Sequence, residues 1–315
     1  WQAINWTQLP ARIEGIIAER VGRLPLTLQE TLQIASVEGE SFTAEVVARV
    51  RRMEAREVIR QLSRALEGQH RLVQGQGSFR SGIQRLSPYR FGHILFQTYV
   101  YNHLDAAERA YLHEEVGNAL ELVYRDRTEE IAEQLARHFE VAGLTAKAVG
   151  YLHQAGIRAA ALLAYAEAIT YFKRALELLV NMPETRDGNL QGLALCIALG
   201  KLLMTTQGYG APEVGIVYER AHALHQKIGD SAQAWQIFFG LCAYYRYHGE
   251  IQRARTLAEE CLRLVEAQTE TAPQVIAHTL LGHILFYVGE IGLSQFHLNR
   301  SFAIYNPEQH RTLDI

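Results

Sequence analysis

Cysteine is scarce in this chain, with three in 315 residues, and no two of them form a C-x-x-C pair. Cys196, Cys242 and Cys261 each fall singly inside a segment with helical apolar spacing. This scarcity excludes a disulfide-stapled secreted fold and a thiolate zinc site. We therefore expect a reduced, cytoplasmic protein whose thiols are buried.

The sequence also lacks a phosphate-binding loop of the form G-x-x-x-x-G-K-[ST]. Such a loop holds nucleotide phosphates with its backbone N–H groups, so the chain is not expected to hydrolyse a nucleotide by itself. The run His113-Glu114-Glu115 misses the H-E-x-x-H zinc spacing, because residue 117 is glycine. We predict that this segment is not an enzyme and binds no cofactor of its own.

One further spacing bears on metal binding. Glu219, His222 and His225 lie three residues apart in turn and share one face of a predicted helix. A metal would need at least one more ligand, and the sequence offers no second E-x-x-H on another helix. We interpret the three residues as helix surface and predict no metal site.

Neither sign of charge dominates, since 31 Lys and Arg face 34 Asp and Glu, for a net charge of −3. The basic footprint of a nucleic-acid-binding protein is therefore missing. No stretch approaches the roughly 20 uninterrupted apolar residues of a membrane helix. We expect neither DNA nor a membrane as partner. The chain begins without methionine and ends without a helix-capping pattern, which indicates a piece of a longer polypeptide.

The first hundred residues carry short helical patterns and one β-hairpin. Thr27 with Glu30, and Thr43 further on, predict helix starts. Helical patterns are predicted over residues 1 to about 24, from Thr27 to the stop at Gly39, from Thr43 with Val50 among its inward residues, and from about Glu54 to Glu67. The hairpin is predicted from Arg71–Gln74, a glycine-rich turn from Gly75 to Gly82, and a returning strand Tyr89–Phe91. Three short helices followed by a two-stranded wing predict a winged-helix domain over residues 1–100.

A helical linker is predicted over residues 101–127. Asp105 is expected to cap its helix, with Glu108 three residues on as the capping-box partner. We interpret the whole stretch from Tyr89 to Tyr124 as the joint that transmits a state of the front domain to the segment behind it.

Residues 128–315 contain an internal repeat. Ala148, Leu152 and Ala155 recur twenty residues later as Ala168, Phe172 and Ala175, and the motif Gly249-Glu250-Ile251 returns forty residues later as Gly289-Glu290-Ile291. A period near forty, with small residues where two helices cross and an aromatic residue beside them, is typical of helical-hairpin repeats. The fold class predicted for the whole chain is therefore all-α, with a tetratricopeptide-like α-solenoid behind a small winged-helix domain.

The segment Ala168-x3-Phe172-x2-Ala175, preceded by Gly156, resembles the signature of tetratricopeptide repeats. Five longer stretches together resemble bacterial signal-transduction ATPases with numerous domains, the STAND class. They are YRFGHILFQTYVY, LDAAERAYLHEEVGNALE, EEIAEQLARHFEVAG, GYGAPEVGIVYERA and IYNPEQHR. The resemblance implies a regulatory region, fused in the parent protein to an ATPase motor that binds ATP or ADP and commonly to a cyclase or transcriptional-activator module.

His93 follows the returning strand of the hairpin, in the context Phe91-Gly92-His93. The resemblance implies that a histidine at this corner contacts the bound diphosphate and holds the inactive state. A helix start favours anions, which supports this role. The alternative is that His93 only caps the helix.

Arg56, Arg60 and Arg64 lie four residues apart on the predicted helix 54–67, where a DNA-binding winged helix has its recognition helix. Such a stripe could contact phosphates. Glu54, Glu57 and Glu67 interleave with it, so we favour solvated or intramolecular pairing and keep DNA binding as an alternative.

The inner groove of the repeats is the better candidate for binding. In tetratricopeptide register, the first helix of each hairpin places aromatic and cationic residues there, which suit a peptide or a small polar effector. The predicted groove residues are Lys201, Phe239, Arg246, Tyr247, His283, Phe286 and Tyr287. The alternative is that several of them only pack between hairpins.

These features predict a non-catalytic sensor region of a bacterial signalling ATPase. A protein or small effector in the groove would shift how the winged helix sits on the motor. The alternatives are a winged-helix DNA-binding transcriptional regulator and a plain protein–protein scaffold.

Overall fold

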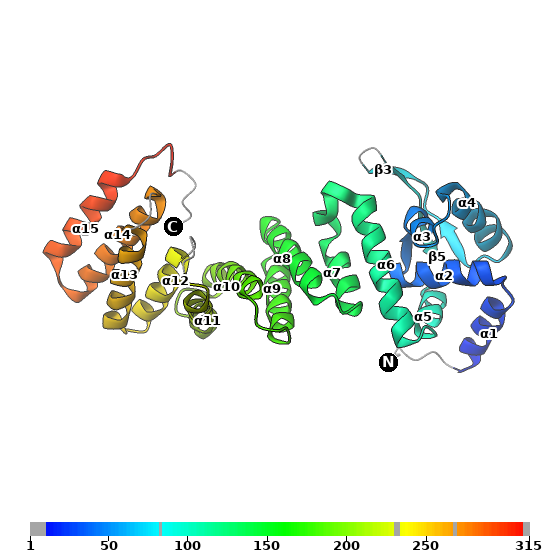
Figure 1. The fold of residues 1–315 in the computed structure, drawn as a ribbon, viewed down its shortest axis with the longest axis horizontal. Helices are drawn as coiled ribbons and strands as arrows, with labels where there is room; N and C mark the ends of the chain where they lie inside the picture. Colours follow the sequence, from blue (N-terminus) through cyan, green and yellow to red (C-terminus); the bar gives the residue numbers. More distant parts are fainter. Residues whose placement is uncertain (1–10, 82–83, 230–233, 267–269, 311–315) are drawn as a thin grey trace, which may run out of the picture. The chain divides into compact units, whose positions relative to one another are not determined.

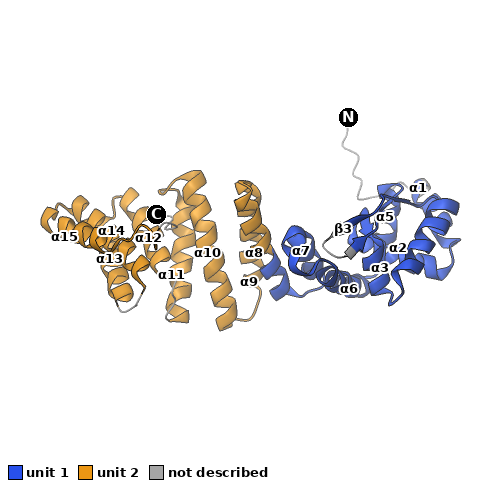
Figure 2. Cartoon of the chain, turned by 90° about the horizontal axis from the view of Figure 1, so that it is seen from above, with its two compact units in different colours: residues 1–151 blue, residues 152–315 orange. Residues whose placement is uncertain are grey.

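The computed structural model describes residues 11–81, 84–229, 234–266 and 270–310 (Figure 1). The chain separates into two compact units, residues 1–151 and 152–315 (Figure 2). Helices dominate both units, which confirms the predicted all-α fold class with tetratricopeptide-like helical repeats behind a small hairpin-bearing domain. The predicted boundaries near residues 100 and 127 stay predictions. Residues 1–10 and 311–315 of the predicted domains lie outside the described residues.

The helices of the first unit are mostly short. They are α1 (Ala11–Gly22), α2 (Leu26–Glu38), α3 (Ala44–Val50), α4 (Ala55–Arg60), the π-helix η1 (Gln61–Gln69), α5 (Ile94–Asn102), α6 (Ala106–Tyr124), the 3₁₀ helix η2 (Arg125–Ile131), α7 (Ala132–Val141) and the first part of α8 (Thr145–Ala161). The strands are β1 (Ser41–Thr43), β2 (Val73–Gly75), β3 (Phe79–Ser81), β4 (Gln84–Leu86) and β5 (Pro88–Phe91).

The predicted hairpin exists as the antiparallel pair of β2 and β5, with Val73 opposite Phe91. The prediction of a turn over residues 75–82 was wrong, because β3 lies there and pairs with β4 to lengthen the hairpin. Residues 82–83 are outside the described residues. β1 was not predicted and completes a sheet of order β1-β5-β2. Strand β1 depends on a tertiary contact, because Phe42 is buried with its ring centroid 5.4 Å from that of Phe91.

The helix starts were predicted with mixed success. Asp105 caps α6 as expected, since its Oδ1 accepts a hydrogen bond from the Glu108 backbone N–H at 2.8 Å. Thr27 is not the cap of α2. That helix starts at Leu26 behind Pro25, whose carbonyl accepts bonds from the backbone N–H groups of residues 28 and 29. Proline's fixed φ suits the entry to a helix, so it displaces the threonine from that role.

Helix α6 is the central element of the first unit. It packs against α2 and α3 on one side and against α7 on the other (Figure 1). A Cβ at Gly117 would lie 2.9 Å from a ring carbon of the fully buried Phe139, so glycine permits the close approach of α6 and α7. The predicted joint from residue 89 to 124 therefore contacts the helices of the front domain. Its role in transmission stays a prediction.

The second unit is a succession of paired helices. They are the rest of α8, α9 (Tyr165–Val180), α10 (Arg186–Gln207), α11 (Pro212–Ile228), α12 (Ala234–Tyr247), α13 (Ile251–Glu266), α14 (Thr271–Val288) and α15 (Ile291–Ile304). Helices α10, α12 and α14 each pair with the helix that follows, and α12 also packs against α10 and α14. The three thiols are buried in α10, α12 and α13, as predicted.

Helix α10 is long and apolar enough, by length and composition, to cross a membrane, and it is the one such helix within the described residues. It packs instead against α9, α11 and α12. Its Leu193, Cys196, Leu199 and Leu203 are buried in these contacts. Its apolar character therefore serves the core of the repeats.

The predicted pairing of small and aromatic residues at helix crossings is confirmed. Gly156 faces the ring of Phe172, and Gly215 faces the ring of Tyr244. The buried Tyr218 of α11 lies between Gly200 of α10 and Gly240 of α12. One aromatic ring thus fills the space that two glycines leave open, and it links two successive hairpins.

We expect Gly200→Ala to destabilise the second unit by about 1–3 kcal/mol, since overpacking of a filled core has that effect. The added Cβ would lie 2.5 Å from Tyr218 Cε2, in a place where the ring has no room to move. Urea unfolding followed by circular dichroism measures the change. The control is Gly292→Ala in α15, where the added Cβ meets no atom within 4 Å apart from its chain neighbours and its own helix backbone. A Gly200→Ala variant as stable as the control would contradict the crossing as described.

Candidate functional site

The predicted groove residues come from the first helices of successive hairpins. Since α12 packs against both α10 and α14, these three helices line a common face of the second unit. Stacked hairpins that curve place their more closely packed helices on the concave side, where such arrays bind their partners. Lys201 lies on α10, Phe239, Arg246 and Tyr247 lie on α12, and His283, Phe286 and Tyr287 lie on α14.

Lys201 and Phe239 line the same cavity, of about 250 Å³. Aromatic rings form much of its wall, and a few polar groups lie among them. The other lining residues are Met204, Thr205, Tyr209, Tyr218, Trp235 and Gln236. The cavity can therefore enclose an apolar group and still offer hydrogen bonds.

Arg246 lies between two tyrosine rings. Its guanidinium carbon is 4.8 Å from the ring centroid of Tyr247 and 5.3 Å from that of Tyr287, and its Nη1 donates to the Tyr287 hydroxyl at 3.1 Å. Cation–π contacts of this kind orient the guanidinium while most of its N–H donors stay available. Tyr247 and Tyr287 are 59% and 56% exposed, so both rings also offer area to a partner.

Tyr209 connects the cavity to Arg246. It lines the cavity, and its ring stacks on Tyr247 with centroids 5.8 Å apart and planes within 5° of parallel. We call this continuous set the aromatic–cation surface. It consists of Lys201, Tyr209, Trp235, Phe239, Arg246, Tyr247 and Tyr287.

The remaining predicted groove residues differ in their position. Phe286 is 59% exposed and meets Tyr287 edge-on at 5.9 Å between centroids, so it extends the surface. His283 is exposed on the same helix, but no contact found among the described residues joins it to the surface. Its part in binding stays a prediction.

The surface carries two cations without a carboxylate partner. Neither Lys201 nor Arg246 takes part in any ion pair between described residues. Other cations of the same unit are neutralised, as Lys173 is by Glu213 and Arg255 is by Glu290 at 2.6 Å. The aromatic–cation surface is thus a local positive site on a chain with a net charge of −3.

Sequence reasoning missed Tyr209 and Trp235. Trp235 lies on α12 one helical turn before Phe239, where the register of the repeats could have found it, whereas Tyr209 lies between α10 and α11, outside any helix. A weak signal existed in the run Gly208-Tyr209-Gly210, because an aromatic residue between glycines marks a close approach of the backbone. A Cβ at Gly210 would lie 3.2 Å from that of Tyr247.

His93 is exposed and caps α5, with its Nδ1 accepting a bond from the Leu95 backbone N–H at 3.2 Å. The capping alternative is therefore what the structure describes. Contact with a nucleotide stays a prediction.

The arginine stripe is exposed, but it is not one continuous helical face. Arg56 and Arg60 lie on α4, whereas Arg64 lies in the π-helix η1. A π-helix closes i→i+5 bonds, as from the His70 N–H to the Ala65 carbonyl at 2.9 Å, so residues four apart no longer repeat the α-helical face. None of the three forms an ion pair with another described residue.

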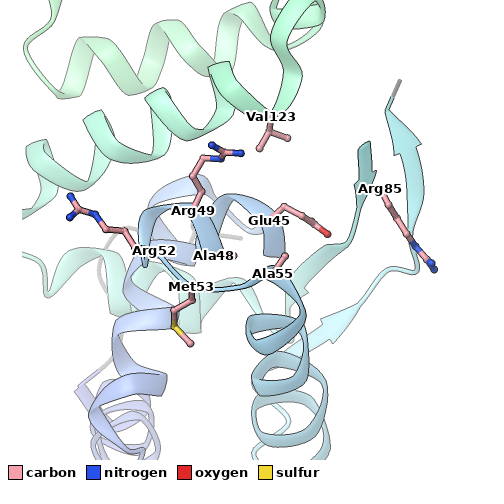
Figure 3. A pocket seen from close by; sticks show the side chains of 8 residues that line it. All are labelled: Glu45, Ala48, Arg49, Arg52, Met53, Ala55, Arg85 and Val123. Atoms are coloured by element: carbon pink, nitrogen blue, oxygen red, sulfur yellow. The ribbon is translucent and has the colours of Figure 1, made fainter. Parts of the chain in front are cut away.

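Another cavity, of about 490 Å³, lies in the first unit and is bordered by Arg49, Arg52 and Arg85 (Figure 3). Their side chains point in different directions rather than into one place (Figure 3). Arg85 donates to the Ser78 hydroxyl at 2.8 Å, and the one carboxylate present, Glu45, accepts from the Ser87 backbone N–H at 2.9 Å. The arrangement does not converge on an anion.

The side chains of Glu219, His222 and His225 contact neighbouring helices of the repeats. The Glu219 carboxylate accepts bonds from the Tyr245 hydroxyl and from Arg253. The rings of His222 and His225 meet Phe238 edge-on, at 5.6 and 6.2 Å between centroids. In the part of the chain that the structure describes, no group of three His, Cys, Asp or Glu side chains could hold a metal ion.

No protein-family model matches the chain. An uncharacterized protein of Rhizobium meliloti (strain 1021) is 28% identical over 154 residues, which is 48% of this chain and 15% of that protein. The chain therefore corresponds to a small part of this relative's length.

Solved structures with a similar arrangement are distant. BtubC of P. vanneervenii has a TM-score of 0.47 at 14% identity, over 64% of this chain and 84% of that one. MamA of Desulfovibrio magneticus RS-1 has a TM-score of 0.42 at 17% identity, over 67% and 100%. A STAND protein with a tetratricopeptide repeat sensor from Pyrococcus horikoshii has a TM-score of 0.41 at 12% identity, over 95% and 47%. No function is carried over at these values.

Proposed function

We propose that the chain is the sensor region of a bacterial signalling ATPase and that it binds a protein partner on its helical repeats. The observation that carries this proposal is the aromatic–cation surface. Exposed tyrosines around an oriented arginine, next to an aromatic cavity, are the residue types that dominate the binding energy of protein interfaces. The surface also lies on the inner helices of the repeats, where such arrays bind their partners.

The proposal assigns no catalysis to this segment. ATP or ADP would bind to a motor elsewhere in the parent protein, and the hairpin-bearing unit would rest on that motor in a cytoplasmic assembly. A partner that binds the repeats better in one state of the whole protein shifts its population toward that state. The resemblance of five sequence stretches to STAND ATPases supports this placement.

We expect deletion of residues 1–315 from the parent protein to raise its basal nucleotide exchange and hydrolysis, because an autoinhibiting arm is lost. The measurement is nucleotide release and phosphate production by the parent with and without this segment. Unchanged rates would contradict the regulatory role. A protein partner that binds this segment in the intact parent without changing nucleotide exchange would favour the plain scaffold.

DNA binding remains the second candidate, because Arg56, Arg60 and Arg64 are exposed and none forms an ion pair with another described residue. Arg80 also lies directly opposite Arg85 on the hairpin, where like charges repel unless an anion lies between them. A salt-dependent affinity for duplex DNA that falls when the three helix arginines become glutamine would favour this candidate.

A further inference from the structure

We propose that the aromatic–cation surface recognises an extended segment of a partner protein in which an aromatic side chain is followed, about three residues later, by an aspartate or glutamate. This inference rests on the proposed function and specifies the chemistry of the partner. The aromatic side chain would enter the cavity beside Lys201, and the carboxylate would bind Arg246.

The size and lining of the cavity favour one aromatic side chain. At about 250 Å³ it lies below the ~300 Å³ at which whole small-molecule sites begin. Trp235, Tyr209 and Phe239 offer ring faces and edges to an entering ring, and aromatic pairs prefer such offset or edge-on contacts. The Gln236 amide also lines the cavity and can bond to a tyrosine hydroxyl or an indole N–H, and the Thr205 hydroxyl, which donates to the Lys201 carbonyl, can still accept from either.

The N–H donors of Arg246 favour a carboxylate as the group that binds there. One of its five N–H donors goes to the Tyr287 hydroxyl, and no described carboxylate takes the others. The planar guanidinium matches a carboxylate with two parallel bonds, and its contacts with Tyr247 and Tyr287 orient it before a partner arrives. Less side-chain freedom is then lost on binding.

The distance between the cavity and Arg246 sets the spacing between the aromatic and the acidic residue of the bound segment. Tyr209 and Tyr247 stack with centroids 5.8 Å apart, and the Arg246 guanidinium lies 4.8 Å from the Tyr247 centroid. An extended chain advances about 3.3 Å per residue, so about three residues reach from the cavity across the two rings to Arg246. The exposed rings of this path offer area to any side chains between the two anchors.

A protein segment fits better than a single-stranded nucleic acid. Nucleic-acid channels follow the backbone with a row of cations, whereas Lys201 and Arg246 are two separate charges. Lys173 and Arg253 of the same unit are paired with Glu213 and Glu219, so they do not extend a positive track.

The test is to pan a display library of random seven-residue peptides on the full 315-residue chain. We expect the enriched peptides to contain an aromatic residue followed about three positions later by Asp or Glu. For the best synthetic peptide, Arg246→Gln should weaken binding about tenfold, as expected for loss of a charge-assisted pair. The matched control is Arg263→Gln, which removes an exposed arginine from the second helix of the same hairpin, and it should change binding less than about twofold.

The outcomes separate this inference from the proposed function. Enriched peptides without an acidic residue, or equal binding to the Arg246→Gln and Arg263→Gln variants, would overturn the inference and leave partner binding in place. Competition by a twenty-nucleotide oligothymidylate that depends on Arg246 would overturn it in favour of nucleic acid. No enrichment on the unmodified chain would remove both the inference and the groove as a protein-binding site.

Discussion

Glu38→Gln is expected to stabilise the first unit at pH 8 by an amount on the order of 4 kcal/mol, and the gain should vanish near pH 4.5. Glu38 ends helix α2 and is 5% exposed. Burial raises the pKa of its carboxyl from 4.5 to about 8, although bonds from the backbone and side chain of Thr43 oppose that rise. Its Oε2 has no hydrogen-bond partner.

The direction of the pH dependence follows from the raised pKa. The folded state holds the Glu38 proton more tightly than the unfolded state does, so the stability linked to it is complete below pH 4.5 and is lost as the pH rises through 8. Glutamine keeps the shape of the neutral carboxyl and cannot ionise. Urea unfolding at several pH values measures the effect, and hydrogen exchange of peptides from residues 11–151 assigns the transition to the first unit.

The control for Glu38→Gln is Glu57→Gln, which changes an exposed carboxylate of α4 in the same way. This control should differ little from the parent at any pH, since an exposed carboxylate is well solvated in both states. A Glu38→Gln variant whose stability relative to the parent does not change with pH would show that Glu38 titrates normally.

The burial of Glu38 could not be predicted from the sequence. An acidic residue before Gly39 at a helix end predicts a solvent-exposed side chain, and no neighbouring residue in the sequence indicates that it is buried. The burial arises because strand β1 folds back beside it, and because Arg137 of α7, 99 positions away in sequence, donates to the Glu38 backbone carbonyl at 2.9 Å. Contacts between residues so far apart in the sequence produce no periodic pattern from which they could be predicted.

The repeats were more predictable, because their spacing is itself the structural rule. Small residues recur at a period near forty where helices cross, and an aromatic ring lies beside several of them, as Tyr218 does beside Gly200 and Gly240. The same register brought Lys201, Phe239, Arg246 and Tyr247 to one face. It could not supply Tyr209, because loop residues follow no helical period and their position depends on how the loop packs against α12.

His113 illustrates a different limit. In the sequence it stands out only as a failed zinc motif, whereas the structure pairs it with His138, Nδ1 to Nδ1 at 3.0 Å. The other ring nitrogen of His113 bonds to the Tyr101 hydroxyl at 3.0 Å. His138 is fully buried and its Nε2 has no partner. Two histidines 25 residues apart on different helices give no local signal of such a pair.

The histidine pair predicts that the first unit loses stability in acid. Burial lowers the pKa of both histidines below the usual 6.5, and the positive charge of Arg137 lowers both further. A lowered histidine pKa contributes stability that is complete above pH 6.5 and is lost as the pH falls, because the unfolded state takes up protons first. At pH 5 the loss should be about 2 kcal/mol for each histidine.

His138→Phe should therefore reduce the acid-linked loss of stability by about half, because one of the two protonation sites is removed and a ring of similar size stays in place. The slope against pH is the readout rather than stability at one pH, since the substitution also leaves His113 Nδ1 without its partner. His103→Phe makes the same chemical change at an exposed position and should alter the slope far less than His138→Phe does, because its contact with Glu14 at 4.0 Å is solvent-exposed. The slope is best measured in the Glu38→Gln background, because Glu38 gains stability over the same fall in pH and would mask the loss. Equal slopes for the two phenylalanine variants would show that the buried pair does not control the acid limit of this unit.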